Sequence, residues 1–223
     1  MYQIAIDGPS GAGKSSLAKA LAKKLGFIYV DTGALYRTIG YYAATHGADT
    51  AKAEEVVSLL GEISLSLAYE NGTQTVILNG ENVGDKIRTP EASMHASNVS
   101  KIPEVRAFLL DTQRNIAESS SVIMDGRDIG TVILPNADVK IFLVSSFETR
   151  ARRRVKELLE KGIDASYEDV LADMIARDKQ DSTREIAPAV PAEDAVHLDN
   201  SDLTFDQTVE AAMAIIAPRI GLV

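Results

Sequence analysis

A glycine-rich segment near the N-terminus ends in a lysine and a serine, Gly8-Pro9-Ser10-Gly11-Ala12-Gly13-Lys14-Ser15. The pattern G-x-x-x-x-G-K-[S/T] predicts a loop that binds nucleoside triphosphate phosphates through backbone N–H groups. Glycine lets the backbone approach phosphate oxygens, and the following helix N-terminus adds N–H groups and a positive dipole end. Lys14 is expected to reach the β- and γ-phosphates, and Ser15 to bind Mg²⁺. A turn that only joins a strand to a helix is the alternative, but it would not need the lysine and the serine. We expect the ATP-binding residues to be Gly8, Pro9, Ser10, Gly11, Ala12, Gly13, Lys14, Ser15 and Ser16.

Arginines beside predicted strand ends and helix termini indicate a second anion site in a chain whose formal net charge is -9. The guanidinium fork matches phosphate oxygens bidentately, so the acceptor is itself expected to be a phosphate. A phosphate monoester is already ionised and needs no general base, and the three histidines fall in no recognisable motif. For each arginine alone, a surface charge or a helix salt bridge is the alternative. The arginines concerned are Arg37, Arg106, Arg127, Arg150, Arg152, Arg153, Arg154, Arg177 and Arg184.

The elements that must position these residues alternate between strand and helix. Apolar runs at 2–6, 27–30, 121–124, 139–144 and 195–198 predict strands, and helical spacing predicts helices at 14–25, 54–60, 103–117, 149–161, 166–179 and 205–216. Thr32 is expected to cap a helix that runs to residue 45, and Gly26 and Ser166 to mark helix ends. Arg177, Asp181 and Arg184 have helical spacing and are expected to share one face. This order predicts an α/β fold with a parallel sheet flanked by helices.

In such a sheet the ligand crevice lies at the carboxyl ends of the strands. The glycine-rich loop, residues 31–37 and residues 125–128 each follow a predicted strand and are expected to meet there. Asp125 and Asp128 have two further readings, as Mg²⁺ ligands or as helix caps. Residues 62–86 differ, because apolar and polar residues alternate and two Asn-Gly pairs, at 71–72 and 79–80, predict turns. We expect a small antiparallel insertion there.

Length and composition limit the remaining choices. At 223 residues, with 45% hydrophobic and 25% charged residues, the chain is expected to be one domain. It has no cysteine, no basic apolar leader and no apolar run of membrane-spanning length. We therefore expect a cytoplasmic monomer that binds neither membrane nor nucleic acid, since the net charge disfavours both.

Taken together, these segments resemble the bacterial-type cytidylate kinases of the nucleoside monophosphate kinase group over nearly the whole chain. The Asp-Gly-Arg-Asp segment and the antiparallel insertion are the specific part, because many families share the phosphate loop. Ser15-Ser16 and Thr32 depart from some relatives, which have Gly-Thr and serine, but each keeps a hydroxyl. The segments that carry the resemblance are 6–14, 31–37, Ile87-Arg88-Thr89, 125–132, 139–143, Arg177-Asp178 with Asp181, and Ala187-Pro188.

The resemblance implies transfer of the γ-phosphoryl group of ATP to CMP or dCMP, with Mg²⁺ as cofactor. It implies a P-loop kinase domain over residues 1–223, with an acceptor-binding insertion at about 62–100 and a helical lid at about 148–180. The phosphate-holding arginines would be Arg37, Arg127 and Arg184, and the lid would supply charge to the transferring group. Catalytic residues would be Lys14, Arg127, Arg150, Arg154 and Arg184. CMP-binding residues would be Thr32, Tyr36, Arg37, Ser97, Arg106, Asp125, Arg127, Asp128, Arg177, Asp181 and Arg184, with Ser97, Arg106 and Asp128 reading cytosine and Arg177 and Asp181 meeting the sugar.

The sequence leaves three other functions to compare with this one. A kinase acting on another nucleoside monophosphate, or on a small-molecule hydroxyl as shikimate-type kinases do, stays open; the hydroxyl acceptor would need a base, for which Asp31 is the candidate. A GTPase-like switch would need an Asn/Thr-Lys-x-Asp motif, which Asp178-Lys179-Gln180-Asp181 does not match. Nucleic-acid binding through the arginines at 150–154 is disfavoured by the net charge.

Overall fold

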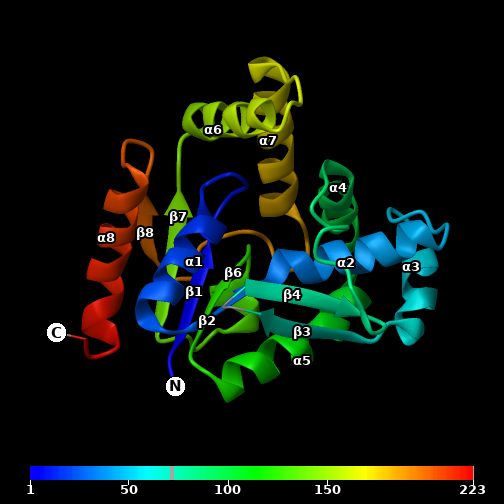
Figure 1. The fold of residues 1–223 in the computed structure, drawn as a ribbon, viewed down its shortest axis with the longest axis horizontal. Helices are drawn as coiled ribbons and strands as arrows, with labels where there is room; N and C mark the ends of the chain where they lie inside the picture. The colour runs from blue at the N-terminus through cyan, green and yellow to red at the C-terminus, as the bar shows by residue number, and fades with distance from the viewer. Residues whose placement is uncertain (71–72, 223) are drawn as a thin grey trace. The chain divides into compact units, whose positions relative to one another are not determined.

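The computed structural model describes residues 1–70 and 73–222, so the turn expected at Asn71-Gly72 lies outside the described residues. The chain folds as two compact units (Figure 1). The first holds residues 28–122 together with Met1, and the second holds residues 2–27 and 123–223. Among the described residues, no helix is both long enough and apolar enough to cross a membrane.

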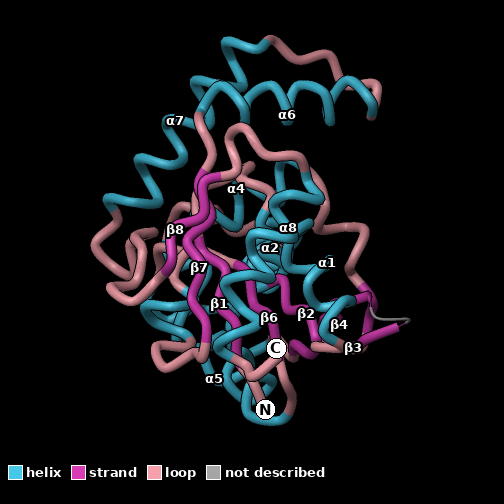
Figure 2. Tube along the Cα trace, turned by 90° about the vertical axis from the view of Figure 1, so that its left-hand side faces the viewer, coloured by secondary structure: helices cyan, strands magenta, loops and turns pink. Residues whose placement is uncertain are grey.

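The central parallel sheet has the strand order β2-β6-β1-β7-β8. Its strands are β1 (Gln3–Asp7), β2 (Ile28–Asp31), β6 (Val122–Asp125), β7 (Val139–Val144) and β8 (Val196–Asp199). In the second unit β1 pairs with β7 in parallel, Ile6 opposite Ile141, and β7 pairs with β8 in parallel (Figure 2). Ile4, Ala5 and Ile6 are fully buried, as expected for a strand covered on both faces.

The second unit's helices are α1 (Lys14–Leu25), α6 (Phe147–Glu160), α7 (Tyr167–Thr183) and α8 (Phe205–Ile216). Two short turns complete it, a π-helical turn at Ile129–Ile133 and a 3-10 turn at Ala217–Arg219. Gly26 ends α1 in the left-handed conformation, and Ser166 caps α7 through the Asp169 N–H, which confirms both predicted ends. The predicted helix 149–161 starts two residues earlier, because Ser146 is its cap.

The first unit combines the small sheet with four helices. The helices are α2 (Thr32–Thr45), α3 (Ala53–Leu59, continued by a 3-10 turn at Leu60–Glu62), α4 (Pro90–Val99) and α5 (Pro103–Ser119). The antiparallel strands are β3 (Leu65–Glu70), β4 (Thr73–Leu78) and β5 (Glu81–Asn82), which confirms the predicted insertion. Asn79 and Gly80 both have positive φ, in keeping with the turn predicted there.

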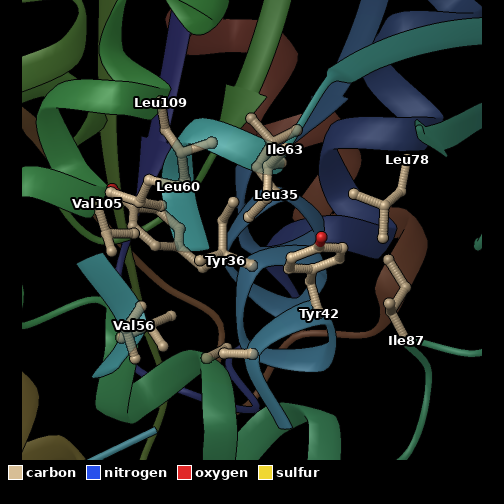
Figure 3. Packing of buried hydrophobic residues seen from close by; sticks show 14 of the residues in the cluster. Leu35, Tyr36, Tyr42, Val56, Leu60, Ile63, Leu78, Ile87, Val105 and Leu109 are labelled. Atoms are coloured by element: carbon tan, nitrogen blue, oxygen red, sulfur yellow. The ribbon is translucent and has the colours of Figure 1, made fainter. Parts of the chain in front are cut away.

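A buried cluster holds this unit together (Figure 3). It includes Leu35 and Ile39 from α2, Val99 from α4, and Val105 and Leu109 from α5, all of which are fully buried. These residues fix the elements that carry Arg37, Ser97 and Arg106.

Two expectations about this unit need correction. The cap of α2 is Asp31, whose carboxylate accepts the Ala34 N–H, and Thr32 is the first helical residue. A carboxylate at an N-cap also meets the positive end of the helix dipole, which a threonine cannot exploit. Helix α4 was not predicted, although Thr89 accepts the Ala92 N–H and Pro90 occupies the first turn, a local start signal.

Candidate active site

The glycine-rich loop joins β1 to α1 and has the backbone that its sequence predicts. Gly8, Gly11 and Gly13 have φ values of 144°, 74° and 92°. A Cβ atom on Gly8 would lie 2.1 Å from the Leu143 carbonyl oxygen, so only glycine fits there. Asn200 Nδ2 donates to the Ala12 carbonyl oxygen at 3.0 Å and fixes the other side of the loop.

Lys14 is buried, and its Nζ donates to the Pro9 carbonyl oxygen at 2.6 Å. Burial, and next the positive charge of Arg127, hold the pKa of Lys14 well below 10.5. The carboxylates of Asp125 and Asp7 act in the opposite direction, and Arg177 adds to the lowering. Lys14, Arg127 and Arg177 are distant in sequence but close enough in space to repel one another. Such a concentration of positive charge is typical of a site that binds a polyanion, and a loop that only connected a strand to a helix would not need it.

Ser15 follows Lys14 and contacts the end of β6. Its Oγ donates to Asp125 Oδ2 at 2.8 Å, which brings a hydroxyl and a carboxylate oxygen together beside the phosphate loop. Both are hard oxygen ligands of the kind that Mg²⁺ prefers. The described residues contain no group of three or more His, Cys, Asp or Glu side chains that could hold a metal ion. The hydrogen bond between Ser15 and Asp125 favours the prediction that Asp125 is a Mg²⁺ ligand.

Asp7, the last residue of β1, anchors the segment that follows Asp128. Its two carboxylate oxygens accept the backbone N–H groups of Ile129 and Gly130 at 2.8 and 2.7 Å. Burial raises the pKa of Asp7 from 3.8 to about 6, although both hydrogen bonds oppose that rise. Sequence reasoning gave Asp7 no role, because a single aspartate at a strand end carries no motif.

Two ion pairs connect the Asp125–Asp128 segment with the end of α7 and the residues after it. Arg127 Nε donates to Asp181 Oδ2 at 3.0 Å, and Arg184 Nη2 donates to Asp128 Oδ1 at 3.4 Å. Four predicted site residues are thereby brought together. The expectation that Arg184 shares a helix face with Arg177 and Asp181 is wrong, because α7 ends at Thr183 and Arg184 is extended. Arg184 Nε instead donates to the carbonyl oxygen of Ala187, and this bond holds the extended segment.

The arginines of α6 lie in different environments. Arg150 is buried, and its Nη1 donates to the Ser10 carbonyl oxygen at 2.8 Å and to Asp178 Oδ2 at 2.6 Å. Arg153 donates to the Asn200 carbonyl oxygen, so it has a structural partner. Arg154 is partly exposed and pairs with Glu157 at 3.2 Å.

In the first unit, Asp31 and Arg37 form a pair at 2.8 Å. Asp31 Oδ1 caps α2 while Oδ2 accepts from Arg37, so both oxygens are engaged. Gln74 of β4 accepts the Asp31 backbone N–H at 2.7 Å and donates to the Asp31 carbonyl oxygen at 3.3 Å. The small sheet therefore holds the end of β2, a role that the alternating sequence of β4 did not reveal.

Arg106 and Tyr36 also meet in this unit. The Arg106 guanidinium lies 5.6 Å from the centroid of the Tyr36 ring, and its Nη1 donates to the Ser100 carbonyl oxygen at 3.2 Å. Ser97 lies on α4, three residues before Ser100, and Thr32 is buried at the start of α2. The structure thus divides the predicted CMP-binding residues into one group in each unit. That the residues at 31–37 meet the other two segments stays a prediction.

Comparisons with known proteins agree over the length of the chain. The family described as cytidylate kinase matches residues 4–218. Relatives named cytidylate kinase include one from Ligilactobacillus salivarius, 48% identical with 97% of each chain covered. Another, from Caldicellulosiruptor saccharolyticus, is 46% identical and covers 98% of this chain and 96% of the relative. A solved structure of an uncharacterized protein from Eubacterium ventriosum covers 99% of both chains with a TM-score of 0.51 and 15% identity, a likeness of fold alone.

Proposed function

We propose, because this chain belongs to the cytidylate kinase family, that it transfers the γ-phosphoryl group of ATP to CMP or dCMP, giving CDP or dCDP. The observation that carries the proposal is the cluster around Lys14. There the phosphate loop, Ser15 with Asp125, and the cations Arg127 and Arg177 come together. Phosphoryl transfer between two polyanions needs positioning and charge stabilisation, and these groups supply both.

ATP would be held by residues 8–16, with Lys14 at its β- and γ-phosphates. Ser15 and Asp125 would hold Mg²⁺, which when bound neutralises charge on the phosphate oxygens. Asp125 would then contact the metal ion, whereas the sequence resemblance assigns it to CMP binding.

The acceptor would be held by the residues that the resemblance assigns to CMP. Arg37, Arg127 and Arg184 would bind its phosphate, Arg177 and Asp181 its sugar, and Ser97, Arg106 and Asp128 its base, with Thr32 and Tyr36 beside it. Arg37, Arg106, Arg127 and Arg184 each donate to a protein oxygen that holds the side chain in place. Preformed pairs of this kind lower the ordering cost of binding. We further propose one kinase domain over residues 1–223, with the insertion at about 62–100 and a lid at about 148–180. It would act as a cytoplasmic monomer without nucleic acid or membrane.

A hydroxyl acceptor gains no support from Asp31, the candidate base. One of its carboxylate oxygens caps α2 and the other pairs with Arg37, so both oxygens already have partners within the protein.

The proposal is tested by a coupled assay for ADP formation with CMP, dCMP, UMP, AMP and shikimate as acceptors. Turnover is expected to be fastest with CMP or dCMP, and no turnover of either would refute the proposal. Preferred turnover of UMP or AMP would move the acceptor assignment to another nucleoside monophosphate.

Arg127→Ala tests the acceptor arginines directly. We expect kcat/KM for CMP to fall by about 10²–10³-fold, the usual effect of removing a donor to developing charge. Thermal unfolding is followed in parallel, because the substitution leaves buried Asp181 without this ion pair. The control is Arg219→Ala, an exposed arginine outside the site, which should keep normal kinetics. Near-normal turnover of the Arg127 variant would contradict the role assigned to Arg127.

A further inference from the structure

Asp178, on α7, bonds with two separate parts of the phosphate-binding region. Its Oδ1 accepts the backbone N–H of Ser10, in the glycine-rich loop, at 3.2 Å. Its Oδ2 accepts from Arg150 Nη1, on α6, at 2.6 Å. The side chains of Asp178 and Arg150 are 14% and 3% exposed, so the pair is largely shielded from water. Asp178 belongs to a segment that carries the family resemblance, but it is not among the predicted catalytic or substrate-binding residues.

Arg150 is fixed on several sides. Its Nε donates to the Ser145 carbonyl oxygen at 3.0 Å, and its Nη1 donates to the Ser10 carbonyl oxygen as well as to Asp178. The guanidinium carbon lies 4.5 Å from the centroid of the Phe147 ring. The described residues give Nη2 no hydrogen-bond partner, so this nitrogen can still donate to a phosphoryl oxygen.

The loop and the two helices also touch through apolar atoms. A Cβ atom on Gly11 would lie 3.0 Å from Met174 Cε, on α7, and 3.5 Å from Arg150 Cβ. Glycine therefore lets α6 and α7 approach the loop closely. Asp178 adds polar interactions to this apolar contact, because its carboxylate links the loop backbone to the Arg150 side chain.

We propose that Asp178 is a positioning residue for phosphoryl transfer, which holds Arg150 and the Ser10 segment of the phosphate loop in one arrangement. The long arginine side chain is then already ordered in the folded protein. Its conformational entropy is therefore not lost again when the transition state forms. The carboxylate also compensates the positive charge of Arg150, whose side chain is buried. The inference rests on the proposed function, in which Arg150 is a catalytic residue that supplies charge to the transferring phosphoryl group.

The test is a double-mutant cycle on kcat. Asp178→Asn keeps an acceptor for the Ser10 N–H but removes the charge that binds Arg150. We expect it to lower kcat by about tenfold or more, with KM for CMP changed less than about twofold. In an Arg150→Ala background the same substitution should change kcat by less than about twofold, because Asp178 acts through Arg150. Arg150→Lys is a second background, since it leaves a cation beside Asp178. The control is Asp173→Asn, an exposed aspartate on the same helix, which should match the wild type.

A second readout follows the loop itself. The Ser10 amide should be protected from hydrogen exchange in the wild type, and Asp178→Ala should raise its exchange rate by about tenfold or more, since the acceptor is lost. An unchanged kcat in Asp178→Asn, an equal loss in both backgrounds, or an unchanged Ser10 exchange rate would each overturn the proposal. If Arg150→Ala itself leaves kcat unchanged, the assignment of Arg150 fails and this proposal fails with it. A lower kcat in Arg150→Ala together with an unchanged kcat in Asp178→Asn would refute the role of Asp178 but not that of Arg150.

Discussion

The buried carboxylate of Asp7 predicts a measurable pH dependence of folding. Asp7 is 4% exposed, and its oxygens accept the Ile129 and Gly130 N–H groups while Asp128 and Lys14 lie nearby. Replacing it with asparagine keeps the shape of the side chain but removes its titration. Asparagine presents an N–H₂ group toward one of the two backbone donors, so the variant should be less stable at every pH. The informative quantity is how the stability difference between the two proteins changes with pH.

The sign and size follow from the pKa. Burial raises the pKa of Asp7 from 3.8 to about 6, so the folded protein holds this proton more tightly than the unfolded chain. The stabilising contribution is fully present below pH 3.8 and is lost as the pH rises through about 6. A difference of about two pH units corresponds to a loss of about 3 kcal/mol. The advantage of the wild type over Asp7→Asn should therefore shrink by roughly that amount between about pH 4 and pH 7.

The free energy of unfolding should be measured in urea for both proteins at half-unit steps from pH 4.5 to pH 8. Asp194→Asn is the control, because Asp194 is exposed and its Lys140 partner lowers its pKa below 3.8. The contribution of a group of that kind is lost only at lower pH, so its difference curve should stay flat over this range. A flat or rising curve for Asp7→Asn would refute the assignment of a raised pKa to Asp7.

Two further substitutions test how the first unit places the residues proposed to bind the acceptor. In Gly40→Ala the new Cβ would lie 2.7 Å from His95 Cβ, so we expect a net loss of about 1–2 kcal/mol and a raised KM for CMP, measured by melting and kinetics. Gly61→Ala, where nothing lies within 4 Å, should change neither, and equal behaviour of the two variants would contradict the packing argument. Gln74→Ala removes both backbone bonds to Asp31 and should cost about 1–3 kcal/mol while raising KM for CMP. An unchanged KM would show that the small sheet does not position the acceptor residues.

Much of the fold was accessible from the sequence because the signals are local. Continuous apolar runs mark the buried parallel strands, and alternation with Asn79-Gly80 marks the small sheet. The phosphate loop could be recognised from spacing alone, because its glycines stand where the backbone requires them. At Gly8, for example, a Cβ atom would lie only 2.1 Å from the Leu143 carbonyl oxygen. Two errors came from competing local options, namely Asp31 rather than Thr32 as the cap of α2, and Arg184 beyond the end of α7.

Partnerships over long sequence separations were decided only by the tertiary structure. Ser15 donates to Asp125, Asp7 accepts from Ile129, and Asp178 accepts from Ser10, across separations of 110, 122 and 168 residues. No periodicity or propensity encodes such pairs, because they arise when strand order brings loop ends together. The sequence by itself determined the glycine-rich loop and predicted which residues bind phosphate, because that signal is local spacing. Tertiary structure decided which carboxylate fixes each cation, because a charge partner is set by distance in space and not by spacing along the chain.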